Sequence, residues 1–367
     1  MSSGPRPVSS VLVVGTGLIG TSIGLALHGE RRVLLADADE SRLRHAVDAG
    51  AGEVWDQTSR VDLAVVAVPP GATATVLADL VRRQAAAALT HVASTQSRVQ
   101  EELDGLDVDL GRICGGHPLA GREVTGPAGA TATLFLGRPW VACPATTTSA
   151  TALSAVQELA VACGGDPLVM SAADHDRAVA LSSHLPQVAA SALAARLLAG
   201  DSAAVRVSGP GLQDTTRIAA SDADLWTEVL AANAGQVAPL ASLLAEDLTR
   251  LAGALDVLAT APADAAGLSV VHELLSRGNA GRALVPVKSG VLDRDVAVVA
   301  VRIADRPGSL AGLLVSAAEA GVNVEDVRVE HLAGRQTGVV ELLVRSAERA
   351  GLSAALSGAG LEVLRSS

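Results

Sequence analysis

The sequence predicts an α/β protein with a Rossmann-type parallel sheet, followed by an all-helical domain and a small α+β domain of the ferredoxin-like type. Short β-branched apolar runs alternate with helical patterns up to about residue 170, as in a doubly wound sheet. Long helical patterns follow, and a strand–helix–strand–strand–helix–strand order occupies the C-terminal segment. We therefore predict three domains, over residues 1–170, 171–288 and 293–367.

The composition is typical of a soluble protein that binds neither nucleic acid nor anionic membranes. The 367 residues are 49% hydrophobic and 18% charged, which suits a globular chain with substantial cores. The formal net charge of −11 disfavours polyanionic partners. Tyrosine is absent and Phe135 is the only phenylalanine, so an aromatic platform for stacked bases is not expected.

The cysteines and two apolar runs bear on the compartment. Cys114, Cys143 and Cys163 form no CxxC pair, which indicates reduced thiols. The run Val11–Leu27 contains several glycines and no convincing cleavage site, so we do not interpret it as a signal peptide. Polar residues and a proline interrupt Ala178–Leu198, which argues against a membrane span. We expect a cytoplasmic protein.

The first strand and the glycine motif after it predict a dinucleotide site. Val11–Val14 is an apolar run typical of a buried parallel strand, and an apolar helical stretch extends to Leu27. Between them a GxGxxG motif allows a tight turn and places a helix N-terminus against a pyrophosphate. The residues predicted to line this site are Gly15, Gly17, Leu18, Ile19 and Gly20.

The second strand ends in an acidic residue that favours NAD over NADP. Val33–Ala36 is followed by Asp37, about twenty residues beyond the glycines, where an acceptor for the ribose 2′-hydroxyl is expected. A carboxylate there would repel a 2′-phosphate. Arg42 or Arg44 could reach toward a 2′-phosphate, which leaves NADP open as the cofactor. The alternative for Asp37 itself is a turn residue at the end of the strand.

Further predicted strands bring polar residues to one edge of the sheet. Leu63–Val68 ends before Pro69, and the next strand ends in His91–Ser94. Gly115-Gly116-His117 follows another strand, and Trp140–Cys143 and Pro167–Met170 complete the sheet. Because ligands bind at the carboxyl ends of parallel strands, Pro69, Ser94 and His117 are expected in one cleft.

His117 lies between glycines and Pro118, which let a ligand approach closely and stiffen the turn. Histidine has an ordinary pKa near neutrality, so it suits proton transfer coupled to hydride transfer. The alternative is a loop histidine that only satisfies backbone groups.

The helical part contains a second group of polar residues. Ser171–Asp174 resembles a capping box, and the helix that it opens leads to His184. A glycine-rich turn then enters a helix with Asp214 and Arg217 three residues apart. An arginine held by an acid is a ready carboxylate receptor, but an ordinary exposed pair has the same spacing.

These motifs occur in the same order in prephenate dehydrogenases, which the sequence resembles over nearly its whole length. The resemblance rests on the glycine motif, Gly116–Glu123, Ser183–Pro186 and Asp214–Trp226. It implies oxidative decarboxylation of prephenate to 4-hydroxyphenylpyruvate with NAD⁺.

By this resemblance His117 accepts a proton from the ring C4 hydroxyl, and Ser94 hydrogen-bonds beside it. Arg217 anchors a substrate carboxylate, with His184 nearby and Asp214 holding the arginine. Positions that line or close the cleft are Glu123 and Trp226.

The segment around Ser94 departs from the family pattern. Relatives commonly have Asp-x-x-Ser-x-Lys, whereas this chain has His91 and Gln96 in place of the acid and the lysine. The local charges beside the nicotinamide therefore differ, which puts the pH optimum and the substrate preference in doubt.

The C-terminal segment resembles an ACT domain, a small amino-acid-sensing module. We predict strands over Val296–Ile303, Val322–His331, Val339–Arg345 and Leu361–Leu364, with one helix that follows the turn Ala304–Ser309 and extends through Ala320, and another from Ala347. By resemblance the effector would be tyrosine, bound by Asp305, Pro307, Gly308 and Asn323. A purely structural dimerisation module is the alternative.

The sequence thus predicts a cytoplasmic, homodimeric, NAD-dependent prephenate dehydrogenase without a metal ion. An arogenate or 4-amino-4-deoxyprephenate dehydrogenase is the nearest alternative, because Asp214, Glu123 or His91 could favour an amine. A nucleotide- and amino-acid-binding regulator without catalysis is the alternative from another class.

Overall fold

The computed structural model describes residues 7–121, 126–199, 205–285, 296–331 and 337–364. These residues form two compact units, Met1–Ala245 and Glu246–Ser367. The division falls within the long helix α11 (Ala234–Thr260). The predicted division into three domains at 170/171 and 288/293 stays a prediction.

An eight-stranded sheet forms the base of the first unit, with strand order β3-β2-β1-β4-β5-β6-β7-β8. The six strands from β3 to β6 are parallel, as predicted, but β7 runs antiparallel to β6 and β8 runs parallel to β7. Parallel strands need a long crossover, usually a helix, and the described part of the β6–β7 connection holds only the short turn η2 (Pro127–Gly129). The strands are β1 (Ser10–Val14), β2 (Arg32–Ala36), β3 (Glu53–Val54), β4 (Val61–Val66), β5 (Ala86–His91), β6 (Ile113–Pro118), β7 (Pro139–Cys143) and β8 (Asp166–Val169).

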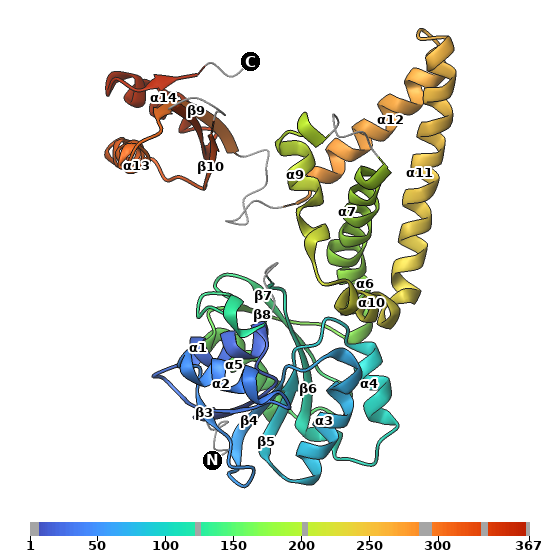
Figure 1. Cartoon of the computed structure of the whole chain (residues 1–367), viewed down its shortest axis with the longest axis vertical. Helices are drawn as coiled ribbons and strands as arrows, with labels where there is room; N and C mark the ends of the chain where they lie inside the picture. Colours follow the sequence, from blue (N-terminus) through green and yellow to red (C-terminus); the bar gives the residue numbers. More distant parts are fainter. Residues whose placement is uncertain (1–6, 122–125, 200–204, 286–295, 332–336, 365–367) are drawn as a thin grey trace. The chain divides into compact units, whose positions relative to one another are not determined.

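Helices cover both faces of this sheet (Figure 1). On one face lie α1 (Leu18–Leu27), α2 (Glu40–Asp48) and α5 (Ala150–Ala162), and on the other lie α3 (Pro70–Arg82) and α4 (Ser97–Asp104). The central strands are apolar on both sides, as buried parallel strands require, and each face has its own core. This packing holds the carboxyl ends of β1, β2, β4 and β5 along one edge.

The glycine motif forms the tight turn that its sequence predicts. Gly15 has φ +100°, and a Cβ on it would lie 2.4 Å from the carbonyl oxygen of Ala67. A Cβ on Gly20 would lie 1.9 Å from the carbonyl oxygen of Gly15. Only glycine lets the strand, the turn and α1 approach so closely.

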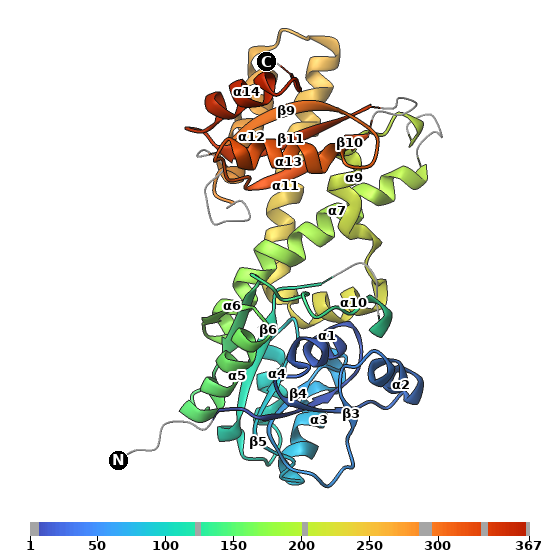
Figure 2. The ribbon, with the colours of Figure 1, turned by 90° about the vertical axis from the view of Figure 1, so that its left-hand side faces the viewer.

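The helical segment Ala172–Ala199 contains a wide turn in its middle. It consists of α6 (Ala172–Val179), the π-turn η3 (Ala180–His184), α7 (Leu185–Arg196) and the short η4 (Leu197–Ala199). Pro186 has no N–H and its ring would crowd the carbonyl four residues earlier, and a local widening relieves both problems. Figure 2 shows α6 beside β6.

By length and composition this segment could cross a membrane, which is weak evidence on its own. Its buried side chains His175, Asp176 and His184 are instead hydrogen-bonded to other parts of the first unit. That arrangement is typical of a helix packed inside a protein.

The remaining helices follow in order along the chain. They are α9 (Pro210–Thr216), the short η5 (Arg217–Ala220), α10 (Ala223–Ala232), α11 and α12 (Ala265–Arg282). Within the first unit, α9 and η5 pack against α7, and α10 packs against α3.

The C-terminal part of the second unit is a four-stranded antiparallel sheet with order β10-β11-β9-β12. Two helices, α13 (Ser309–Glu319) and α14 (Arg349–Gly358), lie on the same side of it (Figure 1). The predicted succession strand–helix–strand–strand–helix–strand along the chain is confirmed. The strands are β9 (Val296–Ala304), β10 (Asp326–His331), β11 (Thr337–Arg345) and β12 (Glu362–Val363).

One strand boundary in this sheet was predicted wrongly. The strand expected from Val322 begins only at Asp326, because the backbone N–H of Val322 bonds to the carbonyl of Ala317 and completes the end of α13. Gly321, with φ +71°, makes this helix ending possible.

Candidate functional site

The nucleotide cradle lies where β1, β2 and β4 end. A carboxylate oxygen of Asp37 accepts hydrogen bonds from the backbone N–H of Thr16 at 2.6 Å and from its hydroxyl at 2.8 Å. Asp37, which follows β2, thus stabilises the conformation of the glycine turn. Gly17 caps the N-terminus of α1, where Leu18 and Ile19 form the first turn, and Pro69 caps α3 beyond β4.

These residues fit a dinucleotide. The space beside Gly17 is open where a Cβ would lie, and the N–H groups of α1 offer an anion site. Asp37 adds a hydroxyl acceptor at the edge. Among the described residues, no group of three or more His, Cys, Asp or Glu side chains is arranged to hold a metal ion.

His117 lies in β6 and is one end of a hydrogen-bonded array with His175 and Asp176. His117 Nδ1 lies 2.8 Å from His175 Nε2, and His175 Nδ1 lies 2.8 Å from Asp176 Oδ1. The two imidazole rings meet edge to face, with centroids 5.0 Å apart. We call these three residues the His–His–Asp array. His175 and Asp176 are fully or almost fully buried.

Asp176 joins this array to the sheet. Its two carboxylate oxygens accept the backbone N–H groups of Gln96 and Ser97, each at 2.8 Å, at the start of α4. Burial alone would raise the pKa of Asp176, but the hydrogen bonds from His175, Gln96 and Ser97 lower it below its usual value. Asp176 is therefore an anion at neutral pH.

His91 and Gln96, the two departures from the family pattern, are both buried beside β6. The Gln96 side-chain N–H groups donate to the carbonyls of Ala93, at 2.7 Å, and Gly116, at 3.2 Å. The Gln96 amide therefore links the loop after β5 to β6. Among the residues that the structure describes, none donates a hydrogen bond to its Oε1.

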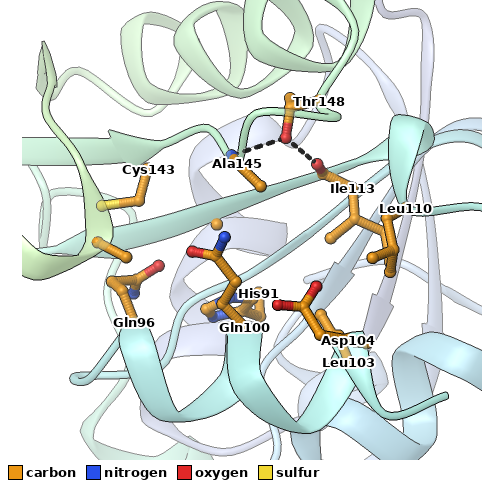
Figure 3. A pocket seen from close by; sticks show the side chains of 12 residues that line it. His91, Gln96, Gln100, Leu103, Asp104, Leu110, Ile113, Cys143, Ala145 and Thr148 are labelled. Atoms are coloured by element: carbon orange, nitrogen blue, oxygen red, sulfur yellow. Dashed lines mark hydrogen bonds between the residues drawn. The ribbon is translucent and has the colours of Figure 1, made fainter.

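A pocket with about 380 Å³ of empty space opens between α4 and the strands β6 and β7. Gln96 and Cys143 lie at one end of it, and Asp104 and Leu110 lie at the other (Figure 3). The Thr148 hydroxyl, bonded to the backbone of Ile113 and Ala145, closes one wall. This pocket lies beneath the array and does not contain His117.

Burial favours the neutral form of His117 and His91. It lowers the pKa of His117 to about 3, with His175, His184 and His91 adding to the effect and Asp176 opposing it. It likewise lowers the pKa of His91 to about 4, and His175 contributes in the same direction. The unprotonated imidazole is the form that accepts a proton.

We predict that the protein loses stability as the pH falls from about 6.5 to 4. Unfolded His91 binds a proton in this range and folded His91 does not, so the unfolded state gains protons and the free energy of unfolding falls. The loss from His91 alone should reach about 3 kcal/mol. Urea unfolding at several pH values measures it. His91→Gln should show a shallower slope, and equal slopes in both proteins would contradict the assignment.

His184 lies at the end of the π-turn and contacts two other helices. Its Nδ1 lies 3.1 Å from the side-chain nitrogen of Asn233, which also donates to the backbone carbonyl of Asp176 at 2.8 Å. Trp226, on α10, meets the His184 ring edge to face at 5.9 Å. Burial lowers the pKa of His184, Asp176 opposes the shift and His175 adds to it. The structure thus brings together two of the predicted substrate residues.

The other predicted substrate residues lie farther along the same unit. Asp214 lies in α9, whereas Arg217 begins η5, so a helix boundary separates them. Both side chains are exposed. Ser94 is half-buried in the loop after β5, next to β6. Glu123 lies outside the described residues.

The predicted effector residues surround the start of α13 in the second unit. Gly308 adopts φ +88° and caps α13, and Asp305 and Pro307 form the exposed turn before it. Asn323, also exposed, donates to Glu325 at 3.2 Å. They stay candidates.

The sequence reasoning missed His175, Asp176 and Asn233 as members of the site. The sequence did contain one signal, the His–Asp pair directly after the capping box. Two such polar residues are unusual at the start of a helix that is buried. Nothing in the sequence connected that pair to His117, 58 positions away. Asn233 carried no signal at all.

Comparison with known proteins decides the family. The model of the prephenate dehydrogenase nucleotide-binding domain matches residues 23–168, and that of the prephenate dehydrogenase dimerization domain matches residues 171–260. The chain belongs to the prephenate dehydrogenase family. It is therefore an NAD-dependent oxidoreductase with a domain of the kind that forms oligomers, and its family consists of soluble metabolic enzymes.

Two curated relatives span most of the chain. The Streptomyces niveus protein named "Probable prephenate dehydrogenase NovF" is 40% identical over 324 residues, which cover 87% of this chain and 90% of the relative. Cyclohexadienyl dehydrogenase of Zymomonas mobilis is 29% identical over 261 residues, 67% of this chain and 88% of the relative.

Solved structures share the fold of this prephenate dehydrogenase family member. Prephenate dehydrogenase from Aquifex aeolicus, solved with hydroxyphenyl propionate and NAD⁺, superposes with a TM-score of 0.63 at 24% identity. Arogenate dehydrogenase from Synechocystis superposes with a TM-score of 0.59 at 25% identity. Each comparison covers 74% of this chain and 98% of the other.

Proposed function

We propose that the protein catalyses the NAD-dependent oxidative decarboxylation of prephenate to 4-hydroxyphenylpyruvate. The observation that carries the proposal is His117, a half-buried, neutral imidazole at the carboxyl edge of the sheet that hosts the nucleotide cradle. No hydrogen bond to Nε2 of His117 comes from any described residue, so this nitrogen is available to a ligand.

The proposed reaction needs orientation and one proton acceptor. The ring hydroxyl on C4 loses its proton to His117 Nε2, and the C4–H electron pair leaves as hydride, which bound NAD⁺ accepts. The bond from C1 to the ring carboxylate breaks, CO₂ leaves, and the electron pair makes the ring aromatic. The phenol product regains a proton on its oxygen. Ser94 would hydrogen-bond the same hydroxyl and aim it at His117.

The helical residues would hold the substrate. We assign Arg217 to a substrate carboxylate, because a guanidinium binds carboxylates through paired hydrogen bonds. Its turn packs against α7, which begins directly after His184. Trp226, whose ring meets that of His184 edge to face, would close the cleft, with Asp214 at its rim. By the family resemblance we also assign Glu123, which lies outside the described residues, to the substrate.

The test follows NADH formation separately with prephenate, arogenate and 4-amino-4-deoxyprephenate. We expect the highest kcat/KM with prephenate. A higher kcat/KM with arogenate or 4-amino-4-deoxyprephenate would identify that compound as the substrate, and the proposed oxidative decarboxylation would still hold. Tight NAD⁺ binding without turnover on all three would support a regulator and contradict an enzyme.

The same assay tests the C-terminal domain. We propose that this βαββαβ unit is an ACT domain that binds tyrosine near Gly308 and that the protein is a cytoplasmic homodimer. Tyrosine should then lower the rate, and sedimentation should report two chains. A rate unaffected by tyrosine would favour a purely structural module.

Asp37 should set the choice between NAD and NADP. We predict that Asp37→Asn raises the ratio of kcat/KM for NADP over NAD by about tenfold, because it removes a negative charge that repels the 2′-phosphate. Steady-state rates with both cofactors measure the ratio. Asp48→Asn, which removes an exposed charge at the end of α2, should leave the ratio unchanged. An unchanged ratio in Asp37→Asn would mean that Arg42 or Arg44 decides the preference.

A further inference from the structure

We infer that His175 and Asp176 are positioning residues that hold His117 in the tautomer a general base requires. The inference rests on the proposed function, in which His117 takes a proton from a substrate hydroxyl. It concerns the direction of each hydrogen bond in the His–His–Asp array.

The direction is set at Asp176. Both of its oxygens accept backbone N–H groups at the start of α4, and an ionised carboxylate has no proton to donate. His175 Nδ1, at 2.8 Å from Oδ1, must therefore carry the hydrogen of that bond.

The next bond follows from the first. We take His175 to carry a single hydrogen, the one on Nδ1, so that its Nε2 has a lone pair and accepts from His117 Nδ1 at 2.8 Å. The hydrogen of neutral His117 is thereby placed on Nδ1. Its Nε2 is left with a lone pair, which is the form that can accept a proton from substrate.

The array also stabilises the product of that step. Once His117 holds a second proton, its Nδ1–H becomes a charge-assisted donor to His175, which in turn donates to the Asp176 anion. The proton itself stays on His117 Nε2. The titratable groups that face His117 are His175, His184, His91 and Asp176, and only Asp176 favours the cation.

The first test reads the tautomer directly in the whole protein without substrate. Protein labelled with ¹⁵N-histidine should show His117 and His175 both protonated on Nδ1 at pH 7. In Asp176→Asn the amide can turn its NH₂ toward His175, so the single tautomer at His117 should be lost. His117 protonated on Nε2 in the wild type would overturn the inference, whether or not the protein turns over any substrate.

The second test is kinetic and uses a double-mutant cycle. Asp176→Asn and His175→Gln should each lower kcat by about 10²-fold while KM for substrate and NAD⁺ stays within about twofold. In a His117→Asn background Asp176→Asn should cost nothing further, because the residues act as a unit. Additive losses would indicate a purely structural role and overturn the inference.

A pH profile and a matched control complete the design. Between pH 7 and 9 the kcat of the wild type should be flat, whereas that of Asp176→Asn should rise as hydroxide replaces the base. Asp174→Asn removes an exposed carboxylate from the same helix and should match the wild type throughout. If wild-type protein shows no turnover, the proposed function fails, and the ¹⁵N result still decides the tautomer.

Discussion

Replacing His117 by asparagine should lower kcat by about 10²-fold or more and leave the affinities for substrate and NAD⁺ close to their wild-type values. Asparagine keeps a polar group in β6, but it cannot take a proton at neutral pH, so the loss falls on the chemical step. NADH absorbance under saturating substrate measures kcat, and NAD⁺ titration measures cofactor binding.

His45→Asn makes the same chemical change at an exposed site on α2 and should have no effect. A His117→Asn enzyme with wild-type kcat would remove His117 from the chemistry. A raised KM at unchanged kcat would make it a binding residue instead.

Replacing Arg217 by glutamine should chiefly weaken substrate binding. The change deletes a charge-assisted contact to a carboxylate that is worth roughly 2–4 kcal/mol, so KM should rise by roughly 30- to 1,000-fold. Steady-state kinetics on the preferred substrate measure the effect, and KM for NAD⁺ should not change.

Arg98→Gln serves as the matched control for Arg217→Gln. Arg98 lies on the surface of α4 and pairs with Glu102 one turn away, a contact worth a few tenths of a kcal/mol. If Arg217→Gln leaves KM unchanged, another residue binds the substrate carboxylate and Arg217 does not.

The nucleotide-binding half was largely predictable from the sequence because its signals are local. The strand of β1, the tight turn at Gly15 and the helix after it are specified within eighteen consecutive residues, 10–27. Their periodicity and glycine spacing leave few other folds. The reversed direction of β7 was not visible, since a strand reads the same in either direction.

The array behind His117 was not predictable for a different reason. Its members come from β6 and α6, which only the packing of the helical segment onto the sheet brings together. A buried polar residue looks like any other polar residue in a sequence until its neighbours are known. Asn233, which ties His184 to the backbone of Asp176, depends on the same packing.

The π-turn at Ala180–His184 determines the angle by which the side chains of α7 are rotated about the helix axis relative to those of α6. Nine residues separate His175 from His184, which in an unbroken α-helix amounts to about 900°, or two and a half turns, and puts them on opposite sides. A wider turn uses more residues for each revolution and rotates His184 back toward His175. Asn233 can therefore reach the Asp176 backbone and the His184 ring with a single amide nitrogen. The turn thus brings His175, the partner of His117, and His184, the partner of Asn233, toward the same side of one helical segment.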